Sequence, residues 1–167
     1  MMTPQLRKWW PPVLAAATMF AIPAQAAGCP SGTVCAADPA GVAAAMQAEG
    51  YRAKLGKAKD GDPMIESASG YDFIVHFYQC SEGKDCKSLQ FLIVFKDDGT
   101  NTPELANRWN KQKRFAQMAA RDDGSMWLSY DVTTVGGLTR ENFADVLDWW
   151  GVMLSQVRTF FSENGAA

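Results

Sequence analysis

The stretches YDFIVHFY at residues 71–78 and LQFLIVF at residues 89–95 decide the fold. Both are rich in β-branched and aromatic residues, which favour strands. Every second residue is large and apolar: Phe73, Val75 and Phe77 in the first stretch, and Leu89, Phe91, Ile93 and Phe95 in the second. The opposite faces are also fairly apolar, with Ile74, Tyr78, Leu92 and Val94. A strand pair covered on one side only should alternate more cleanly. We therefore expect the second face to be either covered or available to a partner.

A polar, turn-like loop joins these two strands and is bounded by Cys80 and Cys86. Cys29 and Cys35 have the same spacing. Four cysteines allow three connectivities. We favour the local pairing, because a bridge across the loop would clamp the mouth of a hairpin. The spacing is too wide for the usual zinc or redox motifs, so we expect disulfides. A thiol oxidoreductase that uses Cys80 and Cys86 is the enzymatic alternative.

The segments on either side of the central strands carry helix and strand signals. They are expected to form a helix at 38–50, strands at 51–59 and 63–69, a helix at 102–121, a strand at 126–135 and a helix that begins at 139. Asp38 and Thr102 are N-cap residues, and each is followed by a proline that suits the first helical position. The order αββββαβα predicts an α+β domain, in which an antiparallel five-stranded sheet packs with three helices.

Residues 1–26 have the features of a secretory signal peptide. Arg7 and Lys8 precede a short apolar run at 13–22, and AQA ends the segment at Ala26. The run is about half the length of a transmembrane helix, so we expect cleavage and no membrane span. Loss of the two basic residues changes the formal charge from the -2 of the full chain to -4. The protein is thus predicted to be periplasmic, where disulfides persist.

A lipoprotein is the alternative to simple cleavage. The sequence AAGC at residues 26–29 is similar to a lipoprotein box, although the usual leucine is missing. Lipidation of Cys29 would anchor the protein to the envelope and would remove the nearest partner of Cys35.

Several short motifs resemble those of one family. They are GDP at 61–63, YQC at 78–80 with CKSLQF at 86–91, NRWN at 107–110 with RF at 114–115, and Asp131 followed by GG at 136–137. They resemble the YbjN domain family, described as regulators of bacterial sensory transduction. The resemblance implies a fold similar to type III secretion chaperones, small α+β domains that commonly pair and bind other proteins. It implies no enzymatic activity and no cofactor.

The resemblance also divides the chain into segments. We expect a signal peptide at 1–26, a disulfide-closed segment at 27–37, a YbjN-like domain at 38–162 and a flexible tail at 163–167. The export signal and the cysteines distinguish this chain from the best-known cytoplasmic members. A cytoplasmic regulatory role is therefore not carried over.

Trp109, Asn110, Arg114 and Trp149 are the predicted partner-binding residues. Tryptophan and arginine are typical anchors of protein interfaces. The alternative for Trp109 is a place in the core. Trp149 precedes Trp150, and adjacent helical residues point about 100° apart, so one apolar stripe cannot bury both equally. Trp149 is expected either to widen the core or to form an exposed contact surface.

Other candidate sites point to structure rather than chemistry. His76 is the only histidine and lies within a strand, so we predict a packed or edge histidine and no catalytic or metal site. Asp131 is expected to turn inward and to pair with Arg114 or Asn110. The acidic net charge argues against a nucleic-acid partner.

The sequence therefore predicts a non-enzymatic, exported, chaperone-like or regulatory module without cofactor. It would bind a protein, and a homodimer is one such arrangement.

Overall fold

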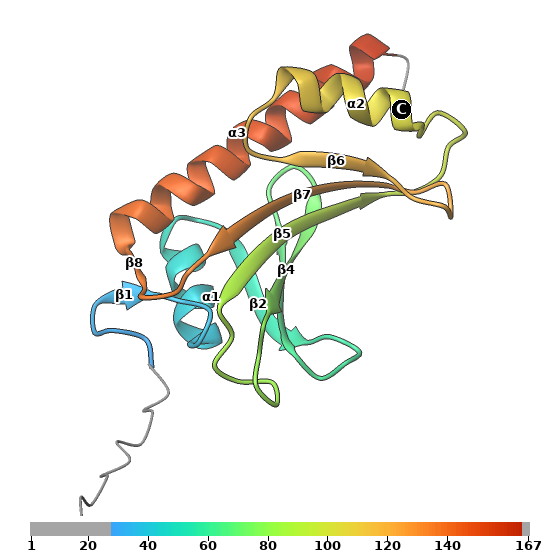
Figure 1. The fold of residues 1–167 in the computed structure, drawn as a ribbon. Coiled ribbons are helices and arrows are strands. Elements are labelled where there is room, and N and C mark those ends of the chain that lie inside the picture. The colour runs from blue at the N-terminus through green and yellow to red at the C-terminus, as the bar shows by residue number, and fades with distance from the viewer. Residues whose placement is uncertain (1–27, 165–167) are drawn as a thin grey trace, which may run out of the picture.

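The two apolar stretches form the centre of the sheet as β4 (Asp72–Tyr78) and β5 (Ser88–Phe95), and they pair antiparallel with Val75 opposite Phe91. The computed structural model describes residues 28–164. Four more strands complete one antiparallel sheet in the order β2-β3-β4-β5-β7-β6 (Figure 1). They are β2 (Arg52–Lys57), β3 (Pro63–Ala68), β6 (Gln117–Ala120) and β7 (Met126–Thr133).

Three helices accompany the sheet: α1 (Pro39–Ala48), α2 (Pro103–Gln112) and α3 (Arg140–Asn164). The predicted caps are confirmed. The Asp38 carboxylate accepts a hydrogen bond from the backbone N–H of Gly41 at 3.0 Å, and the Thr102 hydroxyl accepts one from Leu105 at 3.1 Å. These bonds satisfy N–H groups that lack a partner within the first helical turn.

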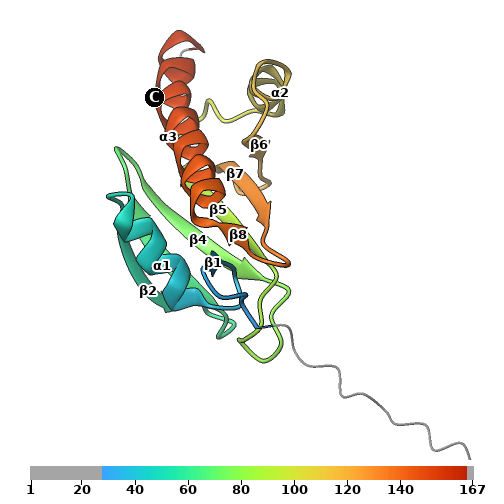
Figure 2. The ribbon, with the colours of Figure 1, turned by 90° about the vertical axis from the view of Figure 1, so that its left-hand side faces the viewer.

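The core lies between the sheet and two of the helices. Figure 2 shows α3 and α1 in front of the strands, on one and the same face of the sheet. Trp150 of α3 is fully buried there, with its ring centroid 5.5 Å from that of Phe73 and 5.7 Å from that of Phe91. The third helix, α2, lies beside β6 and contacts α3 through Trp109 and Phe160, whose ring centroids are 5.3 Å apart.

The predicted α+β class with three helices and an antiparallel sheet is confirmed, but the count of five strands is wrong. The helix expected to reach residue 121 ends at Gln112, and Gln117–Ala120 forms the edge strand β6. At Lys113 the backbone turns to extended angles, with φ -117° and ψ 150°. Residues 117–120 then pair with β7, with Met118 opposite Leu128.

A small second sheet was not predicted. Thr33 and Val34 form β1 (Thr33–Val34), which pairs with β8 (Leu138–Thr139) just before α3. This pairing ties the N-terminal segment to the helix that covers the core. Helix α3 continues to Asn164, two residues into the expected tail, and the remaining tail lies outside the described residues. The predicted signal peptide also lies outside them.

We predict that Gly137→Ala destabilises the fold more than Gly136→Ala does. Both glycines have a positive φ, of 80° and 82°, so each alanine carries a similar backbone cost of about 1 kcal/mol. A Cβ at Gly137 would also overlap the side chain of Thr33 in β1, whereas nothing lies within 4 Å of a Cβ at Gly136. The overlap should add roughly 1–3 kcal/mol. Urea unfolding of the two variants measures the difference, and equal values would contradict a tight β1–β8 contact.

Candidate partner-binding surfaces

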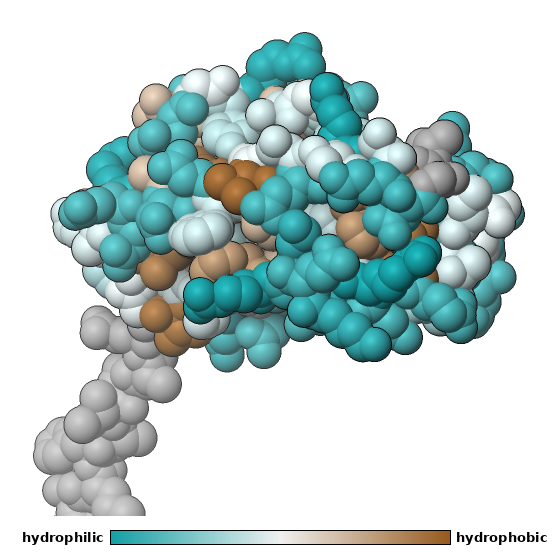
Figure 3. All heavy atoms as spheres, turned by 90° about the horizontal axis from the view of Figure 1, so that it is seen from above, coloured by the Kyte–Doolittle hydropathy of each residue, from teal (hydrophilic) through white to brown (hydrophobic). Residues whose placement is uncertain are grey.

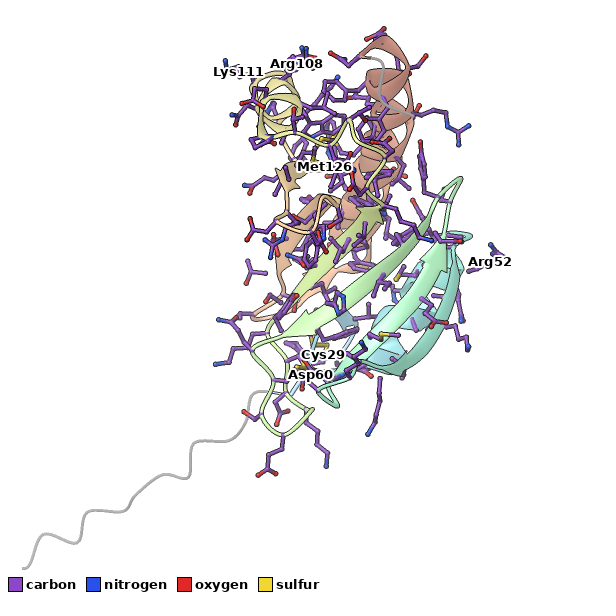
Figure 4. The ribbon with its side chains drawn as sticks, turned by 90° about the vertical axis from the view of Figure 1, so that its right-hand side faces the viewer. Cys29, Arg52, Asp60, Arg108, Lys111 and Met126 are labelled. Atoms are coloured by element: carbon purple, nitrogen blue, oxygen red, sulfur yellow. A yellow bond between two sulfur atoms is a disulfide. The ribbon has the colours of Figure 1, made fainter. Side chains whose placement is uncertain are left out.

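One face of the sheet carries no helix. Figure 4 looks onto this side, with the strands in front and with α1 and α3 behind them. We call it the open face. Its central residues are Met64, Ile74, His76, Tyr78, Gln90, Leu92, Val94, Trp127, Ser129 and Asp131. The strand register places them on the side opposite Phe73, Val75 and Phe91, which are buried against the helices.

Apolar residues occupy one half of the open face. Ile74 lies opposite Leu92, and Val94 lies opposite Trp127. Leu92 is almost fully buried although no helix covers it, while Val94 is 47% exposed. The apolar half is thus packed on itself, the Arg121 guanidinium lies 4.7 Å from the Trp127 ring centroid, and Val94 still presents aliphatic surface to solvent. Such a patch is a candidate contact for another molecule.

A row of polar groups crosses the other half of the open face. The Tyr78 hydroxyl donates to Gln90 Oε1 at 3.3 Å, and Gln90 Nε2 donates to Asp131 Oδ1 at 2.9 Å. The expectation that Asp131 turns inward is therefore wrong. Alternation along β7 places Asp131 with Trp127 on the open face, and its partner is Gln90 rather than Arg114 or Asn110.

Burial shifts the titration of two groups in this region away from charge. Burial lowers the pKa of His76, and the Asp60 carboxylate opposes this effect in part. Burial also raises the pKa of Tyr78, with smaller contributions from Asp131 and Asp60 in the same direction. At neutral pH the face therefore offers a neutral imidazole and a protonated phenol. Both groups form hydrogen bonds with peptide or amide groups without needing a charged ligand.

A hollow of about 540 Å³ lies on the open face. Its lining includes Asp60, Met64, His76, Leu92 and Trp127. The walls come from the β2–β3 turn and from the central strands, so the hollow joins the polar row to the apolar half. A side chain with an apolar body and a polar end would suit it.

Two of the predicted partner-binding residues have structural roles. Trp109 is fully buried, and its indole N–H donates to the carbonyl oxygen of Ala116 at 2.8 Å. Asn110 forms two bonds with Met118 of β6: its Nδ2 donates to the carbonyl oxygen, and its Oδ1 accepts from the backbone N–H, both at 2.9 Å. Trp109 therefore presents no surface to a partner. Its place is in the core, which was the alternative considered for this residue. The amide of Asn110 pairs with the sheet edge as a further strand would.

The other two predicted residues lie together around Phe115. The Arg114 guanidinium lies 5.3 Å from the Phe115 ring centroid, and the Trp149 ring lies 4.3 Å from it. Trp149 is 37% exposed, so it contributes partly to surface. Figure 3 shows the helical side from above, where hydrophilic residues cover most of the surface and hydrophobic ones form small, separate patches. The role of Arg114 and Trp149 in binding remains a prediction.

The cysteines form two local pairs, Cys29 with Cys35 and Cys80 with Cys86. Cys35 and Cys86 are buried and line one mostly apolar cavity of about 320 Å³. Their partners Cys29 and Cys80 are half-buried. Within residues 28–164 there is no group of side chains suited to hold a metal ion, and no helix there is long and apolar enough to cross a bilayer.

The open face was only partly foreseen from the sequence. The apolar second faces of residues 71–78 and 89–95 indicated it, but Trp127 and the Gln90–Asp131 bond were missed. The sequence pattern that could have located Trp127 is alternation along this strand. Met126 and Leu128 are buried in the core, so Trp127 between them points to the opposite face.

Comparison with known families agrees with the motif resemblance. Residues 38–163 match the model of the YbjN family, described as a putative bacterial sensory transduction regulator. The search of curated proteins gives no match to this chain.

We predict that Asn110→Ala destabilises the protein by about 1–2 kcal/mol, because two hydrogen bonds to Met118 are lost at once. Asn107→Ala is the matched control. Asn107 is exposed on the same helix, and its replacement should change the unfolding free energy by less than about 0.5 kcal/mol. Urea unfolding gives both values. Similar losses in the two variants would show that the Asn110 amide does not stabilise the β6 edge.

Proposed function

The chain belongs to the YbjN family, and on this premise we propose that it is an exported, non-enzymatic module that binds another protein through the open face of its sheet. The family description supports a regulatory role. A fold similar to type III secretion chaperones, which bind other proteins, is part of the same proposal.

The open face is the observation that carries the proposal. It combines exposed apolar side chains, such as Val94, with a bonded polar row that ends at Asp131. Protein interfaces commonly have an apolar centre bordered by polar groups. On the helical side Trp149 and Val152 are the exposed large hydrophobic residues of α3, and the hydrophobic patches seen from above are small and separate (Figure 3).

The cysteine pairs support export. Both pairs are close enough to be bonded, and disulfides persist mainly in oxidising compartments. They tie the N-terminal segment and the β4–β5 loop into rigid units. Such cross-links suit a small domain that works outside the cytoplasm.

The side chains around His76 support a binding role rather than a catalytic one. The nearest ring is that of Tyr78, with centroids 6.0 Å apart, and Gln90 lies opposite His76 in the register. All four cysteines are paired, so none of them offers a thiolate nucleophile. These groups fit hydrogen bonding to a partner.

We predict position-specific cross-linking from the open face. A photoreactive benzophenone residue in place of Val94 should give a discrete protein adduct in cells of the host organism. The same residue in place of Val152, which is similarly exposed at 41% but lies on α3, should not. The adduct at position 94 should disappear when Trp127→Arg places a charge in the apolar half. Adducts of equal yield at both positions, or none at position 94, would contradict binding through this face.

We predict that the intact mass of the protein purified from its host corresponds to a chain that begins at Ala27. Alkylation without reductant should add no mass, because all four cysteines are bonded, and alkylation after reduction should label all four. A mass that retains residues 1–26 would contradict export by cleavage. An added acyl mass on Cys29 would instead show a lipoprotein.

A further inference from the structure

The two edges of the six-stranded sheet differ. At one edge, β6 is sealed by side chains: the indole of Trp109 bonds the carbonyl oxygen of Ala116, and the amide of Asn110 bonds both backbone groups of Met118. At the other edge, no strand among the described residues pairs with the outer side of β2. An unpaired edge strand is a template for a further strand.

The outward groups of β2 can be identified from one hydrogen bond. Gln47 Nε2 donates to the carbonyl oxygen of Ala53 at 2.8 Å, from outside the β2–β3 ladder. Backbone groups alternate in direction along an antiparallel strand. The N–H and C=O groups of Leu55 and Lys57 therefore also point outward, while those of Lys54 and Gly56 pair with β3. Leu55 is 43% exposed beside them and offers an apolar contact.

The charge on this edge is basic. Residues 50–59 contain Arg52, Lys54, Lys57 and Lys59 and no acidic residue. Lys54 pairs with Glu66 of β3 at 3.4 Å, but both side chains are largely exposed, and such a pair is weak. Figure 4 shows Arg52 pointing away from the sheet at this edge. Because alternate residues lie on opposite faces, Lys54 and Lys57 flank the edge from both faces.

We propose that the β2 edge accepts an extended, acidic segment of a partner protein as a seventh strand. The inference rests on the proposed function and names the chemistry of the bound segment. Backbone hydrogen bonds to Leu55 and Lys57 hold the segment in register, and Leu55 packs against an apolar side chain. Arg52, Lys54 and Lys57 select glutamate and aspartate. Strand addition obtains affinity from the main chain and specificity from alternate side chains.

A second copy of the chain fits this edge poorly. Antiparallel pairing of two β2 strands about Leu55 would make the Lys54 side chains of the two copies diagonal neighbours on one face. Like charges across a strand pair are destabilising. The charge that attracts an acidic segment thus also discourages self-association.

The test uses the mature, disulfide-bonded protein and two short capped peptides with a fluorescent label. One peptide alternates glutamate and valine, and the other alternates lysine and valine. Fluorescence anisotropy should show binding of the acidic peptide that weakens with salt, and no binding of the basic one. Hydrogen exchange should show that the amides of Leu55 and Lys57 become protected by the acidic peptide. Equal binding of both peptides, protection confined to the open face, or self-association of the protein would overturn the proposal.

Two substitutions at one position separate main-chain from side-chain effects. Leu55→Pro removes the outward N–H and leaves the β2–β3 bonds in place, because proline is tolerated at edge positions that do not donate to the ladder. Leu55→Ala removes the side chain and keeps the N–H. We expect Leu55→Pro to bind the acidic peptide at least about tenfold more weakly than Leu55→Ala. Equal affinities would exclude strand addition.

The double variant Lys54→Glu with Lys57→Glu covers the case in which Leu55→Pro does not fold. Both side chains are exposed, so the thermal unfolding temperature should fall only modestly, through loss of the Lys54–Glu66 pair and the like charge that replaces it. The variant should no longer bind the acidic peptide and should bind the basic peptide instead. An unchanged binding preference would overturn the role of charge. A cross-linked adduct at position 94 that persists in Leu55→Pro, together with failure of the peptide tests, would reject the edge site and leave the proposed function standing.

Discussion

The packing of Trp150 against Phe73 and Phe91 is the contact on which the rest of the structure depends. It holds α3 across β4 and β5, and it decides which face of the sheet is covered. Fully burying a large aromatic side chain contributes several kcal/mol, so the helix cannot change sides at low cost. The other face is left to strands alone. The candidate binding surface is therefore a direct consequence of where the core lies.

Much of the fold could be predicted from local patterns. Alternation in residues 71–78 and 89–95 located the central strands, and the cap-and-proline signals at Asp38 and Thr102 located two helix starts. The β6 strand could not be found in this way. Phe115, Ala116 and Ala119 have a spacing that also suits a helix. What ends the helix is tertiary: the backbone of Ala116 and Met118 is held by Trp109 and Asn110, and residues 117–120 pair with β7.

The candidate site was less predictable, for a related reason. Trp109 and Asn110 have residue types that suit an interface, but sequence cannot distinguish a side chain that meets solvent from one that satisfies a neighbouring strand. The orientation of Asp131 likewise depends on strand register, which places it beside Gln90. Conversely, the apolar second face of the central strands did indicate an open surface. The useful signal was an excess of apolar residues in a strand whose other face already filled the core.

The unequal edges of the sheet have a consequence for assembly size. A sheet with two unsealed edges can polymerise without limit, because each added unit presents a fresh template. Here the amide of Asn110 and the indole of Trp109 terminate growth on one side. Whatever joins the remaining side, edge-to-edge association stops after one addition per molecule. Edge-to-edge stacking of folded copies is therefore disfavoured where α2 covers the backbone of Ala116 and Met118.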